Sequence, residues 1–236
     1  MGDFETLHEP VKPALAAMLA TLPPPEGLLL DVGCGAGGKT PWLRSMLNSL
    51  APLIGLDCDL EALQKAVAHD GLLAVAGDAH ALPLRPACCS AAVCIATLGA
   101  LHHQRVALRE LRRVVRPGGW VLVVTATTAW VPWSAHMRSW VARLYDRVGM
   151  SGELVLATPE PAADLAALLR ETGWNDVRAG AFVIEADGAD VRPALPLLVR
   201  ESLQRHLTLA EVQEYDTIAA SADVELLPLM LAAAAG

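Results

Sequence analysis

The chain has 236 residues, a hydrophobic fraction of 53% and a formal net charge of −8, so it can bury one full α/β core, and no apolar stretch has the length of a membrane-spanning helix. Its five cysteines include no C-x-x-C pair, which predicts neither a disulfide framework nor a structural zinc site and favours a reducing cytoplasm. Because the charge is negative and the basic residues are scattered apart from a short run at 109–116, neither an extended nucleic-acid interface nor a membrane partner is expected.

Apolar runs alternate with amphipathic stretches along the chain, which is typical of a parallel sheet covered by helices on both faces. The runs predict strands, in chain order, over residues 28–32, 52–57, 72–76, 91–97, 120–125, 177–184 and 226–232. In such a sheet the carboxyl ends of the parallel strands converge on one crevice. Polar residues at these ends are therefore the first candidates for a site.

The amphipathic stretches predict helices, most of them with a start or stop signal. They are expected from about Gly38, after the N-cap Asp59, over 106–115, from Thr158 to Gly173, and around a capping box formed by Thr208 and Glu211. Pro117-Gly118-Gly119 is expected to stop the helix that precedes it. The helix after Asp59 is expected to turn one apolar face inward, formed by Leu60, Leu63, Ala66 and Val67.

Residues 31–40 read DVGCGAGGKT and satisfy three nucleotide-site patterns at once. The first, G-x-G-x-x-G, starts at Gly33 and is followed by the acidic Asp57, as in a dinucleotide site. The second, G-x-x-x-x-G-K-T, runs from the same glycine to residue 40, as in a phosphate-binding P-loop. The third, Asp-x-Gly-x-Gly, starts at Asp31 and is the glycine-rich turn of a methyl-donor site.

The charge of Asp31 distinguishes among these patterns. The residue ends an apolar strand, so its carboxylate is expected to share the crevice with the ligand of the turn. It would repel a pyrophosphate, although a helix N-terminus attracts one. S-adenosylmethionine carries an ammonium and a sulfonium, and both gain from a carboxylate in a partly dry site. The sequence therefore favours the methyl donor.

A P-loop also needs a second carboxylate that holds magnesium at the end of a later apolar strand. The later apolar runs at 91–97 and 120–128 contain no Asp or Glu, and the strand ending at Asp57 follows too closely to serve. Lys39 and Thr40 are therefore interpreted as the ordinary first turn of a helix.

Four blocks stand in order along the chain: LLLDVGCGAG at 28–37, LIGLDCDLEAL at 53–63, AGDAHALPL at 76–84 and ALRELRRVVRPGGWVLVV at 107–124. Together they resemble the class I S-adenosylmethionine-dependent methyltransferases, in the branch that includes ubiquinone and menaquinone methyltransferases. The resemblance implies a Rossmann-like α/β fold with a seven-stranded, mostly parallel sheet, helices on both faces and an antiparallel last strand. It also implies S-adenosylmethionine as cofactor, S-adenosylhomocysteine as product, and no metal.

The resemblance further implies which residues hold the methionine end of the cofactor. Asp31 and the backbone of Gly33, Cys34 and Gly35 would contact it, because glycine permits close backbone approach. A carbonyl among Ala96, Thr97 and Leu98 would meet the ammonium of the donor. Which carbonyl does so stays open, since the family usually shows Phe-Asp just before the fourth strand, where this chain reads Cys88-Cys89-Ser90-Ala91.

The adenosine end is expected to lie against the second and third strands. Asp57 would accept hydrogen bonds from both ribose hydroxyls, since a carboxylate has two oxygens. Asp78 would accept one from the adenine amino group, and the backbone of Ala79 would donate one. The side chains expected to flank the adenine ring are Cys58, Leu60 and Leu82. As an alternative, Asp57 caps a helix and Asp78 is a turn residue.

A single domain is expected over 1–236, with a helical cap at 1–24 and a cofactor-binding core at 25–126. The segments 127–157 and 191–222 are expected to cover the substrate. The first of them gathers Trp and Met residues over 130–150, which suits an aromatic or isoprenoid-like acceptor. The same side chains are also typical of core filling.

Methyl transfer requires alignment, a dry site and, for some acceptors, a base. His102 and His103 follow the fourth strand and are the candidate bases, while His136 and Tyr145 lie in the aromatic segment. Alternatively, one of the two adjacent histidines orders the turn. The sequence predicts a cytoplasmic monomer or homodimer that methylates a small, aromatic or apolar molecule. RNA methylation and a non-catalytic S-adenosylmethionine-binding partner subunit stay open as alternatives.

Overall fold

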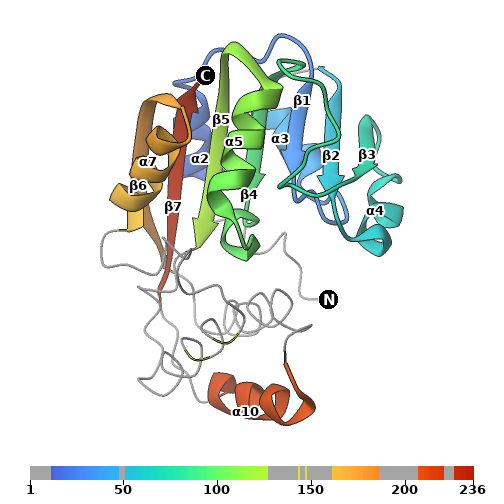
Figure 1. Ribbon diagram of the computed structural model, residues 1–236, viewed down its shortest axis with the longest axis vertical. Helices are drawn as coiled ribbons and strands as arrows, with labels where there is room; N and C mark the ends of the chain where they lie inside the picture. Colours follow the sequence, from blue (N-terminus) through green and yellow to red (C-terminus); the bar gives the residue numbers. More distant parts are fainter. Residues whose placement is uncertain are drawn as a thin grey trace.

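A computed structural model describes residues 12–47, 51–126, 143, 147, 161–185, 207–220 and 226–236. The strands are β1 (Leu29–Val32), β2 (Leu53–Asp57), β3 (Leu72–Ala76), β4 (Cys89–Ile95), β5 (Val115–Ala126), β6 (Asn175–Glu185) and β7 (Leu226–Ala235). They form a seven-stranded sheet in the order β3-β2-β1-β4-β5-β7-β6 (Figure 1). All pairs among β1 to β5 are parallel, and β7 is antiparallel to β5 and β6. The predicted Rossmann-like sheet with an antiparallel last strand is confirmed.

Helices cover both faces of this sheet. They are α2 (Lys12–Leu19), α3 (Thr40–Leu47), α4 (Leu60–Ala66), α5 (Gln104–Val114), α7 (Pro161–Glu171) and α10 (Leu209–Ala220), with the short 3-10 turn η2 (Leu98–Ala100). In Figure 1, α5 and α7 lie in front of the sheet, and α2 and α3 lie behind it. Among the residues that the structure describes, no helix has the length and apolarity needed to cross a membrane.

The core is centred on β4 and the helices in front of it. Every residue of β4 is buried, as expected for a central parallel strand that is covered on both faces. In α5 the inward face consists of Gln104, Ala107, Leu108, Leu111 and Val114. The buried indole of Trp174 packs beside this face and donates to the carbonyl oxygen of Leu108 at 3.3 Å. This packing holds α5 against the sheet in front of β4 and β5.

The fourth strand lies two residues earlier than the sequence predicted. β4 starts at Cys89 and ends at Ile95, so Ala96 and Thr97 follow the strand. Its pairing with β5 is irregular between Cys89 and Ala91. The predicted start at 91 was wrong because Cys89 and Ser90 are also buried residues of the strand. The residue types at these two positions did not indicate a strand.

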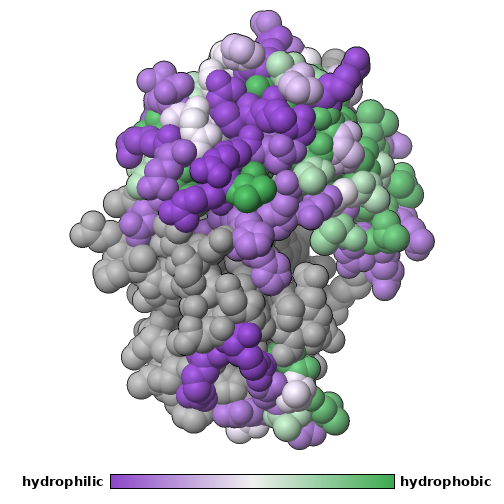
Figure 2. Space-filling model, in the orientation of Figure 1, coloured by the Kyte–Doolittle hydropathy of each residue, from purple (hydrophilic) through white to green (hydrophobic). Residues whose placement is uncertain are grey.

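The inner face predicted for α4 is correct at Leu63 and Ala66 but wrong at Leu60 and Val67, which are 63% and 65% exposed. α4 is short and packs beside β3, the edge strand of the sheet, so the sheet covers a narrower stripe of this helix than was expected. Figure 2 shows the resulting apolar surface over α4 and β3, on the right of the view. The N-cap role of Asp59 is confirmed, since its side chain accepts from the backbone of residues 61 and 62.

Most of the two segments expected to cover the substrate, 127–157 and 191–222, lies outside the described residues, as do His136 and Tyr145. The predicted capping box before α10 is confirmed. The backbone N–H of Thr208 donates to Glu211 Oε2 at 2.8 Å, and the Thr208 hydroxyl donates to the same oxygen at 2.7 Å. Glu211 also pairs with Arg147, a contact between residues of the two predicted segments.

Candidate cofactor site

The loops that follow β1, β2, β3 and β4 meet at one edge of the sheet. The backbone N–H of Gly33, after β1, donates to the carbonyl oxygen of Leu56 at 2.8 Å. The N–H of Gly77, after β3, donates to the carbonyl oxygen of Asp57 at 3.0 Å. Blocks far apart in the sequence are thereby brought to the position where open α/β sheets bind ligands.

The turn after β1 depends on glycine in two different ways. Gly33 and Gly35 have φ values of 73° and 56°, which residues with a side chain rarely adopt. A Cβ at Gly33 would lie 2.0 Å from Thr97 Oγ1, whereas a Cβ at Gly35 would meet nothing within 4 Å. Gly33 is thus required by the packing of the protein itself, whereas the space beside Gly35 is not filled by protein atoms.

Asp57, at the end of β2, joins this turn directly. Its Oδ2 accepts from the backbone N–H of Gly35 at 2.8 Å, and its Oδ1 accepts from that of Asp59 at 3.0 Å. A carboxylate offers about four acceptor positions. The side chain therefore retains the capacity to accept from a vicinal diol while it holds the turn. Cys58, the next residue, has an exposed thiol.

Asp31 and Lys39 form a buried ion pair under the turn. Lys39 Nζ lies 3.3 Å from Asp31 Oδ1, and the two side chains are 6% and 0% exposed. The ammonium also donates to the carbonyl oxygens of Gly33 at 2.7 Å and Ile95 at 3.4 Å. Burial raises the pKa of Asp31, and the charge of Lys39 opposes that rise.

The backbone of Lys39 begins the first turn of a helix, as predicted, since its carbonyl oxygen accepts from the N–H of Leu43 at 3.0 Å, but its side chain has a role that the interpretation did not include. α3 starts at Thr40, and the Lys39 side chain points back under the glycine turn instead of along the helix. The ammonium is bound by protein oxygens, whereas a P-loop lysine must reach a phosphate. The Asp31 carboxylate has a cationic neighbour and no exposed surface. Its predicted effect on the methionine end would therefore be indirect, through the glycine turn that lies above it.

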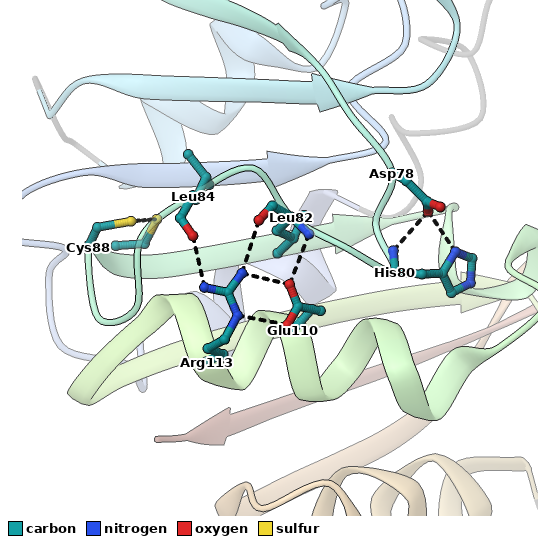
Figure 3. A network of polar contacts seen from close by, with 8 residues as sticks. Asp78, His80, Leu82, Leu84, Cys88, Glu110 and Arg113 are labelled. Atoms are coloured by element: carbon teal, nitrogen blue, oxygen red, sulfur yellow. Dashed lines mark hydrogen bonds and ion pairs between the residues drawn. The ribbon is translucent and has the colours of Figure 1, made fainter.

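Asp78 lies in the loop after β3 and is joined to His80, which was not among the predicted site residues. Asp78 Oδ1 accepts from the backbone N–H of His80 at 2.9 Å and lies 2.6 Å from Nδ1 of the same residue (Figure 3). The backbone hydrogen bond from His80 is the main cause that lowers the pKa of Asp78. His80 Nε2 in turn accepts from the backbone N–H of His103 at 3.2 Å. The loops after β3 and β4 are thus linked.

A second network holds the remainder of the loop after β3 against α5. Arg113 donates to the carbonyl oxygens of Leu84 at 2.8 Å and Leu82 at 3.0 Å (Figure 3). Glu110 pairs with Arg113 at 2.6 Å and accepts from the backbone N–H of Leu82 at 2.9 Å. Ala79 and Leu82 are 8% and 4% exposed and belong to the hydrophobic core. The Leu82 side chain, predicted to flank adenine, therefore packs inward.

Other predicted site residues occupy the same edge with different degrees of exposure. The Cys34 thiol is tucked against Gly55, and burial raises its pKa to about 12, so it stays protonated. Thr97 Oγ1 donates to the carbonyl oxygen of Ile95 at 3.2 Å. His102 and His103 lie just before α5, and the ring of His103 is edge-on to that of His80 with centroids 5.8 Å apart.

Comparison with known proteins agrees with this geometry. Residues 30–123 match the methyltransferase domain family. The chain is 30% identical over 167 residues to a demethylmenaquinone methyltransferase of Corynebacterium kroppenstedtii, a match that covers 70% of this chain and 69% of that protein. It is 35% identical over 143 residues to a tRNA (carboxymethyluridine(34)-5-O)-methyltransferase of Arabidopsis thaliana, where the match covers 55% of this chain but only 33% of the relative's length.

Among solved structures, the phosphoethanolamine N-methyltransferase 2 of Haemonchus contortus in complex with S-adenosyl-L-methionine superposes with a TM-score of 0.62 at 16% identity, over 95% of this chain and 52% of that one. At this identity the likeness concerns the fold. The sequence matches carry the assignment further: the chain belongs to the class I S-adenosylmethionine-dependent methyltransferases, and the predicted resemblance is confirmed.

The described residues fit the cofactor of this family. The open place above Gly35 leaves room for a ligand against the backbone, and the spare acceptor capacity of Asp57 suits a ribose diol. Asp78 is exposed, and the hydrogen bond from the backbone of His80 lowers the pKa of its carboxyl, so its oxygens suit an amino group as acceptors. The donor set contains carboxylates and backbone groups, which suits an adenosine with a cationic tail better than a polyphosphate.

Proposed function

We propose that the protein transfers a methyl group from S-adenosylmethionine to a small, aromatic or apolar molecule. The cofactor supplies a methyl group already activated on a sulfonium, so the protein has to orient the acceptor, exclude water and, for a protic acceptor, remove a proton. The observation that carries the donor half is the hydrogen bond from Gly35 to Asp57, which holds the glycine turn and the diol acceptor in one unit.

Each residue has a distinct place in this proposal. Asp57 holds the ribose, and Asp78 with the backbone of Ala79 recognises the adenine. The methionine end lies against the backbone of Gly33, Cys34, Gly35, Ala96 and Thr97, with Asp31 beneath it. His102 or His103 takes the proton of the acceptor. Both histidines stand in the loop that His80 ties to Asp78, so base and adenine loop are positioned together.

The acceptor class is supported by charge and by the relatives. The match to the demethylmenaquinone methyltransferase extends over more than two thirds of that protein, and its name denotes a quinone-like substrate. A net charge of −8 disfavours a polyanionic acceptor, because phosphates would have to approach a negative surface.

A tRNA acceptor is the second candidate, since the Arabidopsis relative is a tRNA methyltransferase. Its sequence identity to this chain, 35%, is higher than the 30% of the demethylmenaquinone methyltransferase. The match to the Arabidopsis relative covers only a third of its length, so the other two thirds of that protein have no counterpart among the matched residues. RNA methylation is therefore an outcome that the acceptor assay must distinguish.

Calorimetric titration tests the donor half. The protein is titrated separately with S-adenosylhomocysteine, NADH and ATP, and saturable binding is expected for the first alone. Asp57→Ala should weaken S-adenosylhomocysteine binding at least about tenfold, or about 1.4 kcal/mol, because two hydroxyls lose a charged acceptor. Glu61→Ala removes an equal charge from the exposed side of α4 and should leave the affinity unchanged. Equal affinities of the Asp57→Ala variant and the wild type would refute the assignment.

Labelled S-adenosylmethionine then tests the acceptor half. Turnover is measured with small phenols and quinol-like molecules on one side and with unmodified tRNA on the other. Methylation of the small molecules supports the proposal, and methylation of tRNA alone replaces it by the second candidate. A protein that binds S-adenosylhomocysteine but labels neither acceptor class would favour a non-catalytic partner subunit.

A further inference from the structure

The lysine of the P-loop-like sequence has a place in the fold that phosphate binding does not explain. Lys39 is 5% exposed, and its ammonium lies between the ends of two neighbouring strands, β1 and β4. This is the point in the sheet where the strand order reverses direction, and where open α/β sheets bind their ligands. A buried cation at that point needs a specific reason, since lysine is almost never fully buried unless it is paired.

The contacts of Lys39 connect groups that the donor turn must hold still. Its Nζ donates to the carbonyl oxygen of Gly33 at 2.7 Å and to that of Ile95 at 3.4 Å. Gly33 opens the turn, and Ile95 is the last residue of β4, directly before Ala96 and Thr97. One side chain therefore joins both backbone segments to which the methionine end of the donor is assigned.

The same ammonium is the cationic partner of Asp31. The distance between Nζ and Oδ1 is 3.3 Å, and neither Asp31 oxygen has a partner with hydrogen-bond geometry among the described residues. A carboxylate that is fully buried without a countercharge is strongly unfavourable. The pairing also leaves the floor of the turn close to neutral, with the charge of Asp57 at its rim.

We propose that Lys39 is a positioning residue of the donor site: it keeps Asp31 ionised beneath the glycine turn and fixes the Gly33 and Ile95 carbonyls, so that the turn is shaped before the donor arrives. Its effect on donor binding rests on the proposed function, whereas the pairing itself does not. The lysine in this G-x-x-x-x-G-K-T sequence thus serves the protein's own carboxylate instead of a phosphate.

Two kinds of variant separate this role from simple packing. Lys39→Met keeps most of the side-chain volume and removes the charge, and Lys39→Met combined with Asp31→Asn removes both charges. Lys65→Met, at an exposed lysine that pairs with Glu61 on α4, is the matched control. Urea unfolding without ligand and S-adenosylhomocysteine affinity are measured for each protein from about pH 8 to about pH 5, a range that covers raised pKa values of buried carboxyls.

The proposal predicts a pH-dependent defect. Without Lys39 the pKa of Asp31 rises further, and the penalty for its buried charge is relieved as the pH falls and the carboxyl is protonated. The Lys39→Met variant should therefore lose stability and at least about tenfold in affinity at the upper pH and approach the wild type at the lower one. The other groups that face the pair are Asp57, Cys34 and Cys94; burial raises the pKa of both thiols to about 12, outside the range.

The double variant should be more stable than Lys39→Met at the upper pH, because no uncompensated charge stays buried. A Lys39→Met defect that is the same at every pH and is not relieved by Asp31→Asn would overturn the proposal, since lost packing alone behaves in that way. If Lys39→Met does not fold at the upper pH, recovery of folding in the double variant gives the same answer. If the wild type does not bind S-adenosylhomocysteine, the proposed function fails, and the ligand-free unfolding series still tests the pair.

Discussion

Gly33 and Gly35 share a left-handed backbone conformation but differ in their surroundings, so replacing each by alanine should have different consequences. A methyl group at position 33 would lie 2.0 Å from Thr97 Oγ1, within the protein. We expect Gly33→Ala to lower the free energy of unfolding by more than about 2 kcal/mol, because backbone strain and a steric clash add up. Urea denaturation without ligand is the measurement.

At position 35 a methyl group would enter the open place on the turn and meet no protein atom within 4 Å. Gly35→Ala should therefore cost only the strain of a positive φ, about 1–2 kcal/mol. Its main effect is expected on S-adenosylhomocysteine affinity, with at least about a tenfold loss. A Gly35→Ala variant that binds the ligand as well as the wild type would place the donor elsewhere.

The site was predictable at the residue scale where a motif fixes the backbone, and unpredictable where a side chain crosses to another element. Asp57 and Gly35 stand in separate motifs, and the structure joins them at 2.8 Å. The contacts of Lys39 and His80 could not be predicted from the sequence. The first depends on the burial of Asp31 and the second on a contact with a loop after a different strand, and neither follows from local spacing.

At the scale of elements, the loop after β3 and the helix α5 behave as one unit because of the network between Glu110 and Arg113. Arg113→Met removes the donors to the carbonyl oxygens of Leu82 and Leu84, and leaves Glu110 without its cationic partner. We expect a loss of about 1–3 kcal/mol in the free energy of unfolding. Arg109→Met, on an exposed position of the same helix, should change it by less than about 0.5 kcal/mol.

The pH dependence of this network has a definite sign. The hydrogen bond from Arg113 is the main cause that lowers the pKa of Glu110 below its ordinary 4.5. A carboxyl with a lowered folded-state pKa contributes stability above its unfolded pKa and loses that contribution as the pH falls through the folded value. The difference in unfolding free energy between the wild type and Glu110→Gln should therefore be largest near neutral pH and shrink below about pH 4.5. A difference that grows on acidification would exclude the ion pair as its cause.

Elements were predicted best where one local signal decides them. β3 is a short apolar run between turns and has the predicted bounds, 72–76, and Asp59 caps α4 as expected. The predicted bounds of β4 were two residues too late, and half of the predicted inner face of α4 was wrong. Both features depend on neighbouring elements: the bounds of a strand depend on the strands that it pairs with, and the buried face of a helix depends on the width of the sheet that covers it. Sequence periodicity reports that a face is apolar, and the edge position of β3 decides how much of it is covered.

For the whole molecule, the alternation of apolar runs and amphipathic stretches predicted a parallel sheet covered on both faces, and the family resemblance implied seven strands with an antiparallel last strand. The observed sheet agrees with that expectation, but its strand order, with β7 between β5 and β6, was not predicted. The acceptor side was not predictable to the same depth, because the residues that select an acceptor share chemistry with ordinary core residues. Tryptophan and methionine serve both purposes.

The net charge of −8 gives a test of the acceptor class that applies to whichever acceptor the screen identifies. A polyanionic acceptor bound through several phosphates releases counterions, and its apparent affinity falls by about 10³–10⁵ between about 50 and 200 mM salt for 6–10 contacts. A small neutral acceptor has no such term. For the acceptor that the screen identifies, we expect kcat/KM to change less than about twofold over this salt range, measured at saturating S-adenosylmethionine. A steep decrease of kcat/KM with salt would instead indicate that the acceptor is bound through several phosphates, as a nucleic acid is, contrary to the expectation from the net charge.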